Sequence, residues 1–289
     1  MCSSSHKHQI VNSVHPFLSQ GLIYLSLLSS LLLLAKAAVA EVKVVESGNV
    51  KAEFSFQEQN FCLTSPHLKL MSAGQVVLDQ LLPESNNRPC RLTGLQIVNL
   101  DNAQQPEVII DLYTGGAHCC TYSLIYYFEP QSKQYKYLEH SWGNVGYRLK
   151  ALDRKGRLQF VSADDRFAYE FSSYAASAFP IQIWQYQLGK MVDVTRQYPQ
   201  LIYSNAYYQW HLYSQQQKQC QPFWGACGEG ILAAYLADKY LLGQEQDGWQ
   251  RVRASYRGGG CEASGVCRGA QNYFNQLRQF LQKTSYIQR

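Results

Sequence analysis

The chain has 289 residues, of which 46% are hydrophobic and 16% are charged, and its formal net charge is +5. This length accommodates one large domain or two smaller ones, each with a sizeable core. The charge is mild and no Lys/Arg cluster accompanies it, which excludes nucleic acid as an expected partner.

Residues 1–40 have the three-part pattern of a secretion signal. Lys7 gives a weakly basic start, residues 21–34 are mostly apolar, and small residues occupy positions 38–40. The apolar run is shorter than a comfortable membrane span, and Lys36 interrupts its far end. We expect cleavage at the end of this segment, which predicts a secreted or periplasmic protein without stable membrane insertion. An uncleaved anchor is the alternative.

Eight cysteines follow the signal, and an even number in an exported chain predicts disulfides. Four precede residue 121 and four follow residue 219, which suggests that each half of the chain carries its own crosslinks. Each half then allows three connectivities. The eight residues are Cys62, Cys90, Cys119, Cys120, Cys220, Cys227, Cys261 and Cys267.

Alternating apolar and polar residues, rich in β-formers, predict strands through the front half. The predicted strands cover residues 42–56 (with a break at a glycine), 68–70, 76–78, 95–101, 107–113 and 122–128, and one begins at 133. A second series covers residues 147–153, 158–162, 181–186 and 190–194.

These two series of strands resemble each other in spacing. Asp101 corresponds to Asp153 at an offset of 52 residues, and Asp111 corresponds to Asp164 at an offset of 53. Short strands that recur with such a period are typical of propeller blades. We therefore interpret the front half as containing two degenerate propeller-like units. The units cover about residues 92–146 and 147–198.

The pattern becomes helical after residue 198. Helices are predicted at residues 201–217, 230–243 and 249–256. In the last segment an apolar face follows helical spacing and consists of Tyr273, Leu277, Phe280 and Leu281. The predicted fold class is thus α+β, with an antiparallel β-rich domain over residues 41–198 and a helical region over residues 199–289.

An acidic turn precedes one of the strands. Residues 99–108, Asn-Leu-Asp-Asn-Ala-Gln-Gln-Pro-Glu-Val, resemble the turn of FG-GAP/VCBS repeats. In those repeats alternate acidic residues ligate calcium, so the resemblance implies Asn99, Asp101 and Glu107 as ligands. Calcium takes six to eight oxygens, however, and Ala103 stands where a second Asp is expected. A plain Asx-type turn without any cofactor is the alternative.

A longer resemblance extends beyond that turn. Residues 111–120 and 163–169 are similar to segments of uncharacterised exported bacterial proteins. No activity is assigned to those proteins, so this resemblance implies export and little chemistry.

Three potential ligands adjoin one another at His118, Cys119 and Cys120. They are of the kinds that zinc or copper binds, and a thiolate beside imidazole would also be a nucleophile. Neighbouring strand residues point to opposite faces, which makes a shared metal difficult. We expect instead that the two cysteines form disulfides with different partners, Cys62 and Cys90.

Carboxylates form another candidate site. Paired acids can carry out acid/base hydrolysis, so Asp164, Asp165 and His118 are candidate catalytic residues. Asp111 occupies the corresponding place in the first unit, and Arg166 completes a candidate ligand-binding group with these acids. The alternative is a set of solvated loop carboxylates paired with Arg166.

Aromatic side chains are numerous and could contact a sugar or a protein, or fill a β-core. They include Tyr122, Tyr126, Tyr127, Tyr169, Tyr174, Trp184, Tyr207, Tyr208 and Trp210. The sequence has no nucleophile elbow, phosphate-binding glycine loop or His-Glu-x-x-His motif. We therefore expect a non-enzymatic binding or envelope-associated protein that engages a protein or a glycan. The alternatives are a carboxylate-dependent hydrolase and a metal-binding protein at residues 118–120.

Overall fold

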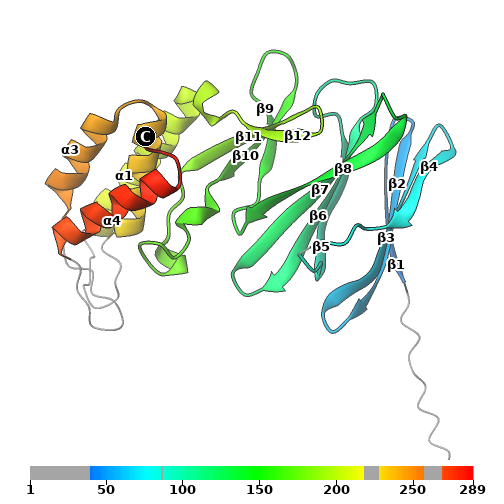
Figure 1. Cartoon of the computed structure of the whole chain (residues 1–289), viewed down its shortest axis with the longest axis horizontal. Helices are drawn as coiled ribbons and strands as arrows, with labels where there is room; N and C mark the ends of the chain where they lie inside the picture. The colour runs from blue at the N-terminus through cyan, green and yellow to red at the C-terminus, as the bar shows by residue number, and fades with distance from the viewer. Residues whose placement is uncertain (1–39, 86, 218–227, 257–268, 289) are drawn as a thin grey trace, which may run out of the picture. The chain divides into compact units, whose positions relative to one another are not determined.

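A computed structural model describes residues 40–85, 87–217, 228–256 and 269–288 (Figure 1). Three four-stranded sheets occupy the front half of the described chain, and in each sheet the strands pair in chain order. Every strand pairing is antiparallel. Helices follow the last sheet, so the expected α+β fold with an antiparallel front half and a helical C-terminal part is confirmed.

The N-terminal sheet consists of β1 (Glu41–Ser47), β2 (Val50–Gln59), β3 (Cys62–Ser72) and β4 (Gln75–Leu81). Its first two strands form a hairpin at Gly48, whose φ of +60° favours glycine. In β2 every second residue is buried, from Val50 through Ala52 and Phe54 to Phe56. This period of two places one face of the sheet in a core.

The second sheet, called the central sheet, consists of β5 (Arg91–Val98), β6 (Glu107–Gly116), β7 (Cys119–Glu129) and β8 (Gln134–Gly143). Val108 and Ile110 belong to a core shared with the N-terminal sheet. Ile109 and Ile125 belong to a core shared with the third sheet. The central sheet is therefore covered on both faces, which explains the nearly continuous apolar run in β6.

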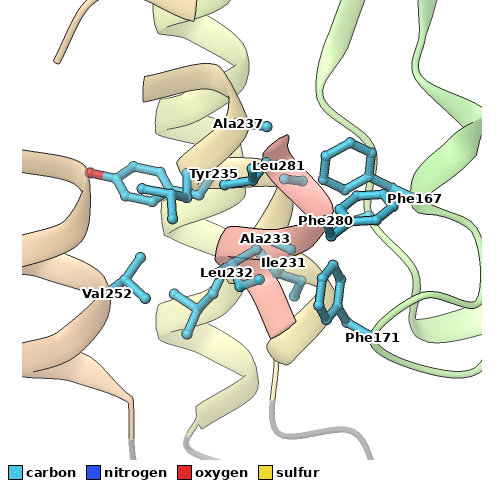
Figure 2. Packing of buried hydrophobic residues seen from close by; sticks show 14 of the residues in the cluster. Phe167, Phe171, Ile231, Leu232, Ala233, Tyr235, Ala237, Val252, Phe280 and Leu281 are labelled. Atoms are coloured by element: carbon cyan, nitrogen blue, oxygen red, sulfur yellow. The ribbon is translucent and has the colours of Figure 1, made fainter. Parts of the chain in front are cut away.

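The third sheet consists of β9 (Arg148–Ala151), β10 (Leu158–Ala163), β11 (Ile181–Gln187) and β12 (Lys190–Asp193). Between β10 and β11 the chain forms two short 3-10 helices, η1 (Asp165–Phe167) and η2 (Tyr174–Ala176). This insertion faces the helices, because the rings of Phe167 and Phe171 contact Phe280 edge-on at centroid distances of 4.8 and 5.3 Å (Figure 2).

The helical region follows η3 (Thr195–Gln197) and consists of α1 (Pro199–Gln216), α2 (Glu229–Leu241), α3 (Glu245–Ser255) and α4 (Ala270–Lys283). The expected apolar face of α4 is confirmed, because its four predicted residues are the buried residues of that helix. They pack with α2, in which every residue from Glu229 to Lys239 is buried (Figure 2). Among the helices that the structure describes, none combines the length and apolarity that crossing a membrane requires.

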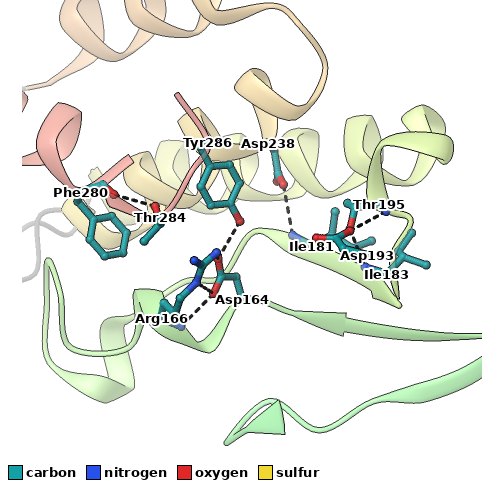
Figure 3. A network of polar contacts seen from close by, with 10 residues as sticks. All are labelled: Asp164, Arg166, Ile181, Ile183, Asp193, Thr195, Asp238, Phe280, Thr284 and Tyr286. Atoms are coloured by element: carbon teal, nitrogen blue, oxygen red, sulfur yellow. Dashed lines mark hydrogen bonds and ion pairs between the residues drawn. The ribbon is translucent and has the colours of Figure 1, made fainter. Parts of the chain in front are cut away.

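A buried carboxylate joins the helices to the third sheet. Asp238 of α2 is 0% exposed, and it accepts a hydrogen bond from the backbone N–H of Ile181 at 3.2 Å (Figure 3). It also accepts one from Nδ2 of Asn205 at 2.8 Å. Burial raises the pKa of Asp238 well above its usual range. The first residue of β11 is thereby held against α2.

The disulfides differ from the expected pattern. Cys62 is bonded to Cys90, and Cys119 is bonded to Cys120. The expectation that the adjacent cysteines bond separately to Cys62 and Cys90 is therefore wrong. It assumed that neighbouring side chains of a strand point to opposite faces, whereas Cys119 and Cys120, the first two residues of β7, are bonded to each other. The predicted disulfides of Cys220, Cys227, Cys261 and Cys267 lie outside the described residues.

We predict that the two disulfides contribute very differently to stability. The Cys62–Cys90 bond joins residues 28 positions apart, and closing such a loop stabilises a folded chain by about 3–4 kcal/mol. The Cys119–Cys120 bond joins chain neighbours and closes almost no loop. Urea unfolding should show a loss of that size for the double variant Cys62→Ser/Cys90→Ser.

The matched control is the double variant Cys119→Ser/Cys120→Ser, which should keep most of the free energy of unfolding. An equal loss in both double variants would contradict the argument from loop length.

Candidate functional site

A cleft of about 830 Å³ opens where the central sheet, the third sheet and the end of the helical region meet. Its lining combines aromatic rings, amides, hydroxyls and charged groups. The lining includes Cys120, His140, Trp142, Asp165, Arg166, Gln182, Trp184, Arg196, Ser285 and Tyr286. Such a mixture of apolar surface with a few polar groups is typical of ligand sites.

Three rings form an aromatic wall in the cleft. His140 and Trp142 lie on the same face of β8, and Trp184 comes from β11. The ring of His140 contacts Trp142 and Trp184 edge-on at centroid distances of 4.2 and 4.6 Å. Burial lowers the pKa of His140 to about 4, so the imidazole is neutral at pH 7. It can then both donate and accept a hydrogen bond.

Asp164 is occupied by structural contacts. Its carboxylate is 2% exposed and accepts hydrogen bonds from Nε and Nη2 of Arg166 at 2.8 and 2.6 Å. The hydroxyl of Tyr286 donates to the same carboxylate at 3.0 Å (Figure 3). Asp164 also caps η1 by accepting from the backbone N–H of Arg166. The alternative prediction from the sequence is a solvated loop carboxylate paired with Arg166. Asp164 is paired with Arg166, but it is buried and not solvated.

Asp165 has a different environment from its neighbour. One carboxylate oxygen accepts a hydrogen bond from the backbone N–H of Asn144 at 3.1 Å, and none of the described residues forms an ion pair with the group. The carboxylate lies so close to Gly143, at φ +61°, that a Cβ there would overlap with it. Burial raises the pKa of Asp165. Of the two candidate acids, Asp165 is therefore the one that could act on a ligand in the cleft.

Asp111 lies in another cavity, of about 320 Å³, at the centre of β6. It accepts hydrogen bonds from Oγ of Ser123 at 2.5 Å and from the hydroxyl of Tyr147 at 3.0 Å. The indole N–H of Trp142 donates to Ser123 at 2.7 Å, and Trp142 lines both cavities. Burial raises the pKa of Asp111. The structure does not bring Asp111 together with Asp164 and Asp165.

His118 occupies the exposed tip of the β6–β7 hairpin. Its ring stacks on Tyr174 at a centroid distance of 4.7 Å, and Nδ1 is hydrogen-bonded to the hydroxyl of Tyr169. The sulfurs of Cys119 and Cys120 are bonded to each other, so neither is a thiolate that could ligate a metal. In the described parts of the chain no three His, Cys, Asp or Glu side chains are arranged to hold a metal ion.

The acidic turn is closed by its own hydrogen bonds. Nδ2 of Asn99 donates to the carbonyl of Ala103 at 2.7 Å, and Asp101 accepts from the N–H of Ala103 at 2.9 Å. Glu107 is 2% exposed, and it accepts from the N–H of Leu100 at 2.8 Å. All three predicted calcium ligands thus take part in the turn itself, and calcium binding here stays a prediction.

The corresponding turn of the third sheet repeats two of these contacts. The N–H of Leu152 donates to Oε1 of Gln159 at 2.8 Å, as Leu100 does to Glu107. The N–H of Lys155 donates to Asp153 at 3.0 Å, as Ala103 does to Asp101. The offset is 52 residues for every member of these pairs, so the correspondence seen in sequence extends to hydrogen bonds.

The two turns also contact each other directly. Nδ2 of Asn102 donates to the carbonyl of Lys155 at 2.5 Å, and the N–H of Leu158 donates to the carbonyl of Leu100 at 3.1 Å. The turns therefore join the central sheet to the third sheet.

The aromatic residues named from the sequence fall into separate roles. Tyr122 and Tyr126 are 1% exposed and belong to the core. Tyr207 and Tyr208 are 66% and 56% exposed on α1, and Trp184 lines the cleft. Of the nine, Trp184 is the one that the cleft lining includes.

Sequence reasoning missed most of the cleft. His140 and Trp142 were overlooked because the strand predicted to begin at residue 133 was not extended, although it reaches Gly143. Their spacing of two residues on a strand was the available signal. Arg196 and Tyr286 carry no local motif, and only the tertiary structure brings them to the cleft.

We predict a pH-dependent stability that depends on Glu107. Burial, followed by the nearby charge of Asp101, raises its pKa to about 7 in the folded protein. In the unfolded chain the pKa returns to about 4.3, so the folded state binds the proton more tightly. The free energy of unfolding is then highest at acidic pH and falls as the pH rises through 7.

The variant Glu107→Gln copies the second turn, where Gln159 accepts the same kind of hydrogen bond. Between pH 5 and pH 8 the unmodified protein should lose about 2–3 kcal/mol relative to this variant, measured by urea unfolding at both pH values. Glu129→Gln, which changes a surface acid paired with Lys136, is the control and should leave the pH trend unchanged. The same trend in Glu107→Gln as in the unmodified protein would contradict the assignment.

The sequence is similar to one domain family and to proteins of two bacteria. Residues 202–285 match a domain family described as the sll0997 C-terminal domain. The chain is 31% identical over 221 residues to a probable thylakoid lumen protein, sll0997, of Synechocystis sp., a match that covers 73% of this chain. It is 26% identical over 206 residues to the uncharacterized protein y4bJ of Sinorhizobium fredii, a match that covers 66% of this chain.

No solved structure matches the chain. The matches span 62% of the Synechocystis protein and 30% of the Sinorhizobium protein, so this chain is similar to a part of each relative.

Proposed function

We propose that this chain is a non-enzymatic binding protein of an exported compartment, and that its cleft binds a neutral polar ligand such as an oligosaccharide. The observation that carries the proposal is the composition of the cleft. An aromatic wall of His140, Trp142 and Trp184 stands beside amide and hydroxyl groups such as Gln182 and Ser285. Rings that contact sugar faces, with polar groups for the hydroxyls, suit a glycan.

The charges of the cleft favour a neutral ligand. Arg166 is paired with Asp164. Arg196 donates to the carbonyls of Tyr240 and Leu241, at the end of α2, at 3.1 and 2.9 Å. Both guanidinium groups thus already bind acceptors within the protein, so we do not expect the cleft to prefer an anionic ligand.

Export is supported by three independent features. The N-terminal segment has the pattern of a secretion signal, the structure contains disulfides, and a relative is described as a probable thylakoid lumen protein. A secreted, periplasmic or luminal location would each agree with these features.

We also propose that the central and third sheets are degenerate copies of one propeller-like unit of the FG-GAP/VCBS type, and that the chain divides near residue 199. The shared turn hydrogen bonds at an offset of 52 residues support the first idea. The domain match over residues 202–285 supports the second.

Titration of the exported protein with maltohexaose, cellohexaose and chitohexaose, followed by tryptophan fluorescence, tests the binding role. We expect a saturable change with at least one sugar, because Trp142 and Trp184 line the cleft. Trp184→Ala should abolish it, whereas Tyr207→Ala, on the exposed face of α1, should not. The absence of a saturable change with every sugar would overturn the proposal.

A carboxylate-dependent hydrolase is the second candidate. The observation that favours it is Asp165, whose pKa is raised by burial and which forms no ion pair with any residue that the structure describes. The same incubations distinguish the two. Shorter sugars that appear with the unmodified protein and disappear with Asp165→Asn would establish hydrolysis. Intact sugars with saturable binding would favour the binding role.

A further inference from the structure

The Cys119–Cys120 disulfide does not crosslink distant parts of the fold. The bond joins chain neighbours, so it removes little freedom from the unfolded chain, in contrast to the Cys62–Cys90 bond. Stabilisation by loop closure therefore does not explain the Cys119–Cys120 disulfide, which points to another role.

The position of this disulfide is accessible. Cys119 pairs with Gly116 across the two-residue turn of the β6–β7 hairpin, and both cysteines are partly exposed. Cys120 lines the 830 Å³ cleft. Cys62 and Cys90 are partly exposed as well, and Gly115 packs so closely that a Cβ there would lie 3.0 Å from the Cys90 Cβ. The two disulfides therefore differ in the chain length that they close and in the place of Cys120 in the cleft wall.

A single hydroxyl holds the peptide group between the two sulfurs. Oγ1 of Thr114 accepts a hydrogen bond from the N–H of Cys120 at 2.8 Å and donates to the carbonyl of Cys119 at 3.0 Å. Both hydrogen-bonding groups of the peptide that closes the disulfide ring are thus bound by one side chain of β6. This contact supports the oxidised form of the pair.

We propose that Cys119–Cys120 is a redox-active site that accepts two electrons from a dithiol reductant entering through the cleft. The inference goes beyond the proposed binding role and does not depend on it. It rests on three observations: the two cysteines are partly exposed, Cys120 lies in the wall of the cleft, and the bond joins chain neighbours, so its reduction would open no long loop of the fold.

The reaction follows ordinary thiol–disulfide exchange. A thiolate of the reductant attacks one sulfur of the pair, the sulfur–sulfur bond breaks, and the other sulfur leaves as a thiolate that takes up a proton. The second thiol of the reductant then attacks the mixed disulfide. The reductant departs as a cyclic or internal disulfide, and Cys119 and Cys120 remain as two thiols.

The test exposes the folded, exported protein to graded concentrations of dithiothreitol, followed by acid quenching, alkylation with N-ethylmaleimide and peptide mass spectrometry. We expect alkylation of Cys119 and Cys120 at dithiothreitol concentrations about tenfold below those that reduce Cys62–Cys90, which corresponds to about 30 mV for a two-electron couple. Circular dichroism at each concentration verifies that the protein stays folded.

Thr114→Val removes the hydroxyl and keeps the side-chain shape, so reduction of the pair should shift to lower dithiothreitol concentrations. Thr121→Val is the matched control, because the Thr121 hydroxyl donates to the carbonyl of Gly143 and not to the peptide between the cysteines. If Thr114→Val does not fold, the comparison of the two disulfides in the unmodified protein still decides the question.

The proposal is overturned if Cys119 and Cys120 become alkylated together with Cys62 and Cys90, or only once the protein unfolds. Isolation of oxidised protein in which the adjacent cysteines are bonded to other residues would also overturn it. None of these results bears on sugar binding, which is measured separately.

Discussion

The double burial of the central sheet is the constraint on which the other features depend. Its strands carry apolar side chains to both faces, so one face shares a core with the N-terminal sheet and the other with the third sheet. A side chain on the second face must therefore be apolar or fully hydrogen-bonded. Asp111 satisfies this demand through Ser123 and Tyr147, and Glu107 satisfies it through a backbone N–H.

The need of buried polar groups for hydrogen-bond partners also gives two neighbouring carboxylates, Asp164 and Asp165, different roles. Asp164 is committed to Arg166 and Tyr286, which connects the end of β10 to the residues after α4. Asp165 accepts a hydrogen bond from the backbone N–H of Asn144 and lies beside Gly143 at the cleft. A pair of acids that looks symmetrical in the sequence thus divides into one structural group and one that can meet a ligand.

The fold class and most strands could be predicted because strand and helix periodicities are local. The buried face of α4 was predictable residue by residue, and the repeat offset pointed to two similar sheets. The cleft was not predictable, since His140, Arg196 and Tyr286 come from segments that only tertiary packing brings together. The disulfide pairing was not predictable from strand alternation, because Cys119 and Cys120 both lie at the start of β7 and are nevertheless bonded to each other.

The direct contact between the two corresponding turns limits how the chain can vary in length. Asn102 donates to the carbonyl of Lys155, and Leu100 accepts from the N–H of Leu158. The conformation of each turn is therefore fixed in part by hydrogen bonds to the other turn. An added residue in either turn would displace donors and acceptors in both sheets at once. Evolutionary insertions should therefore accumulate at hairpins such as residues 130–133, which have no such partner turn in the described structure, and should avoid residues 100–107 and 152–159.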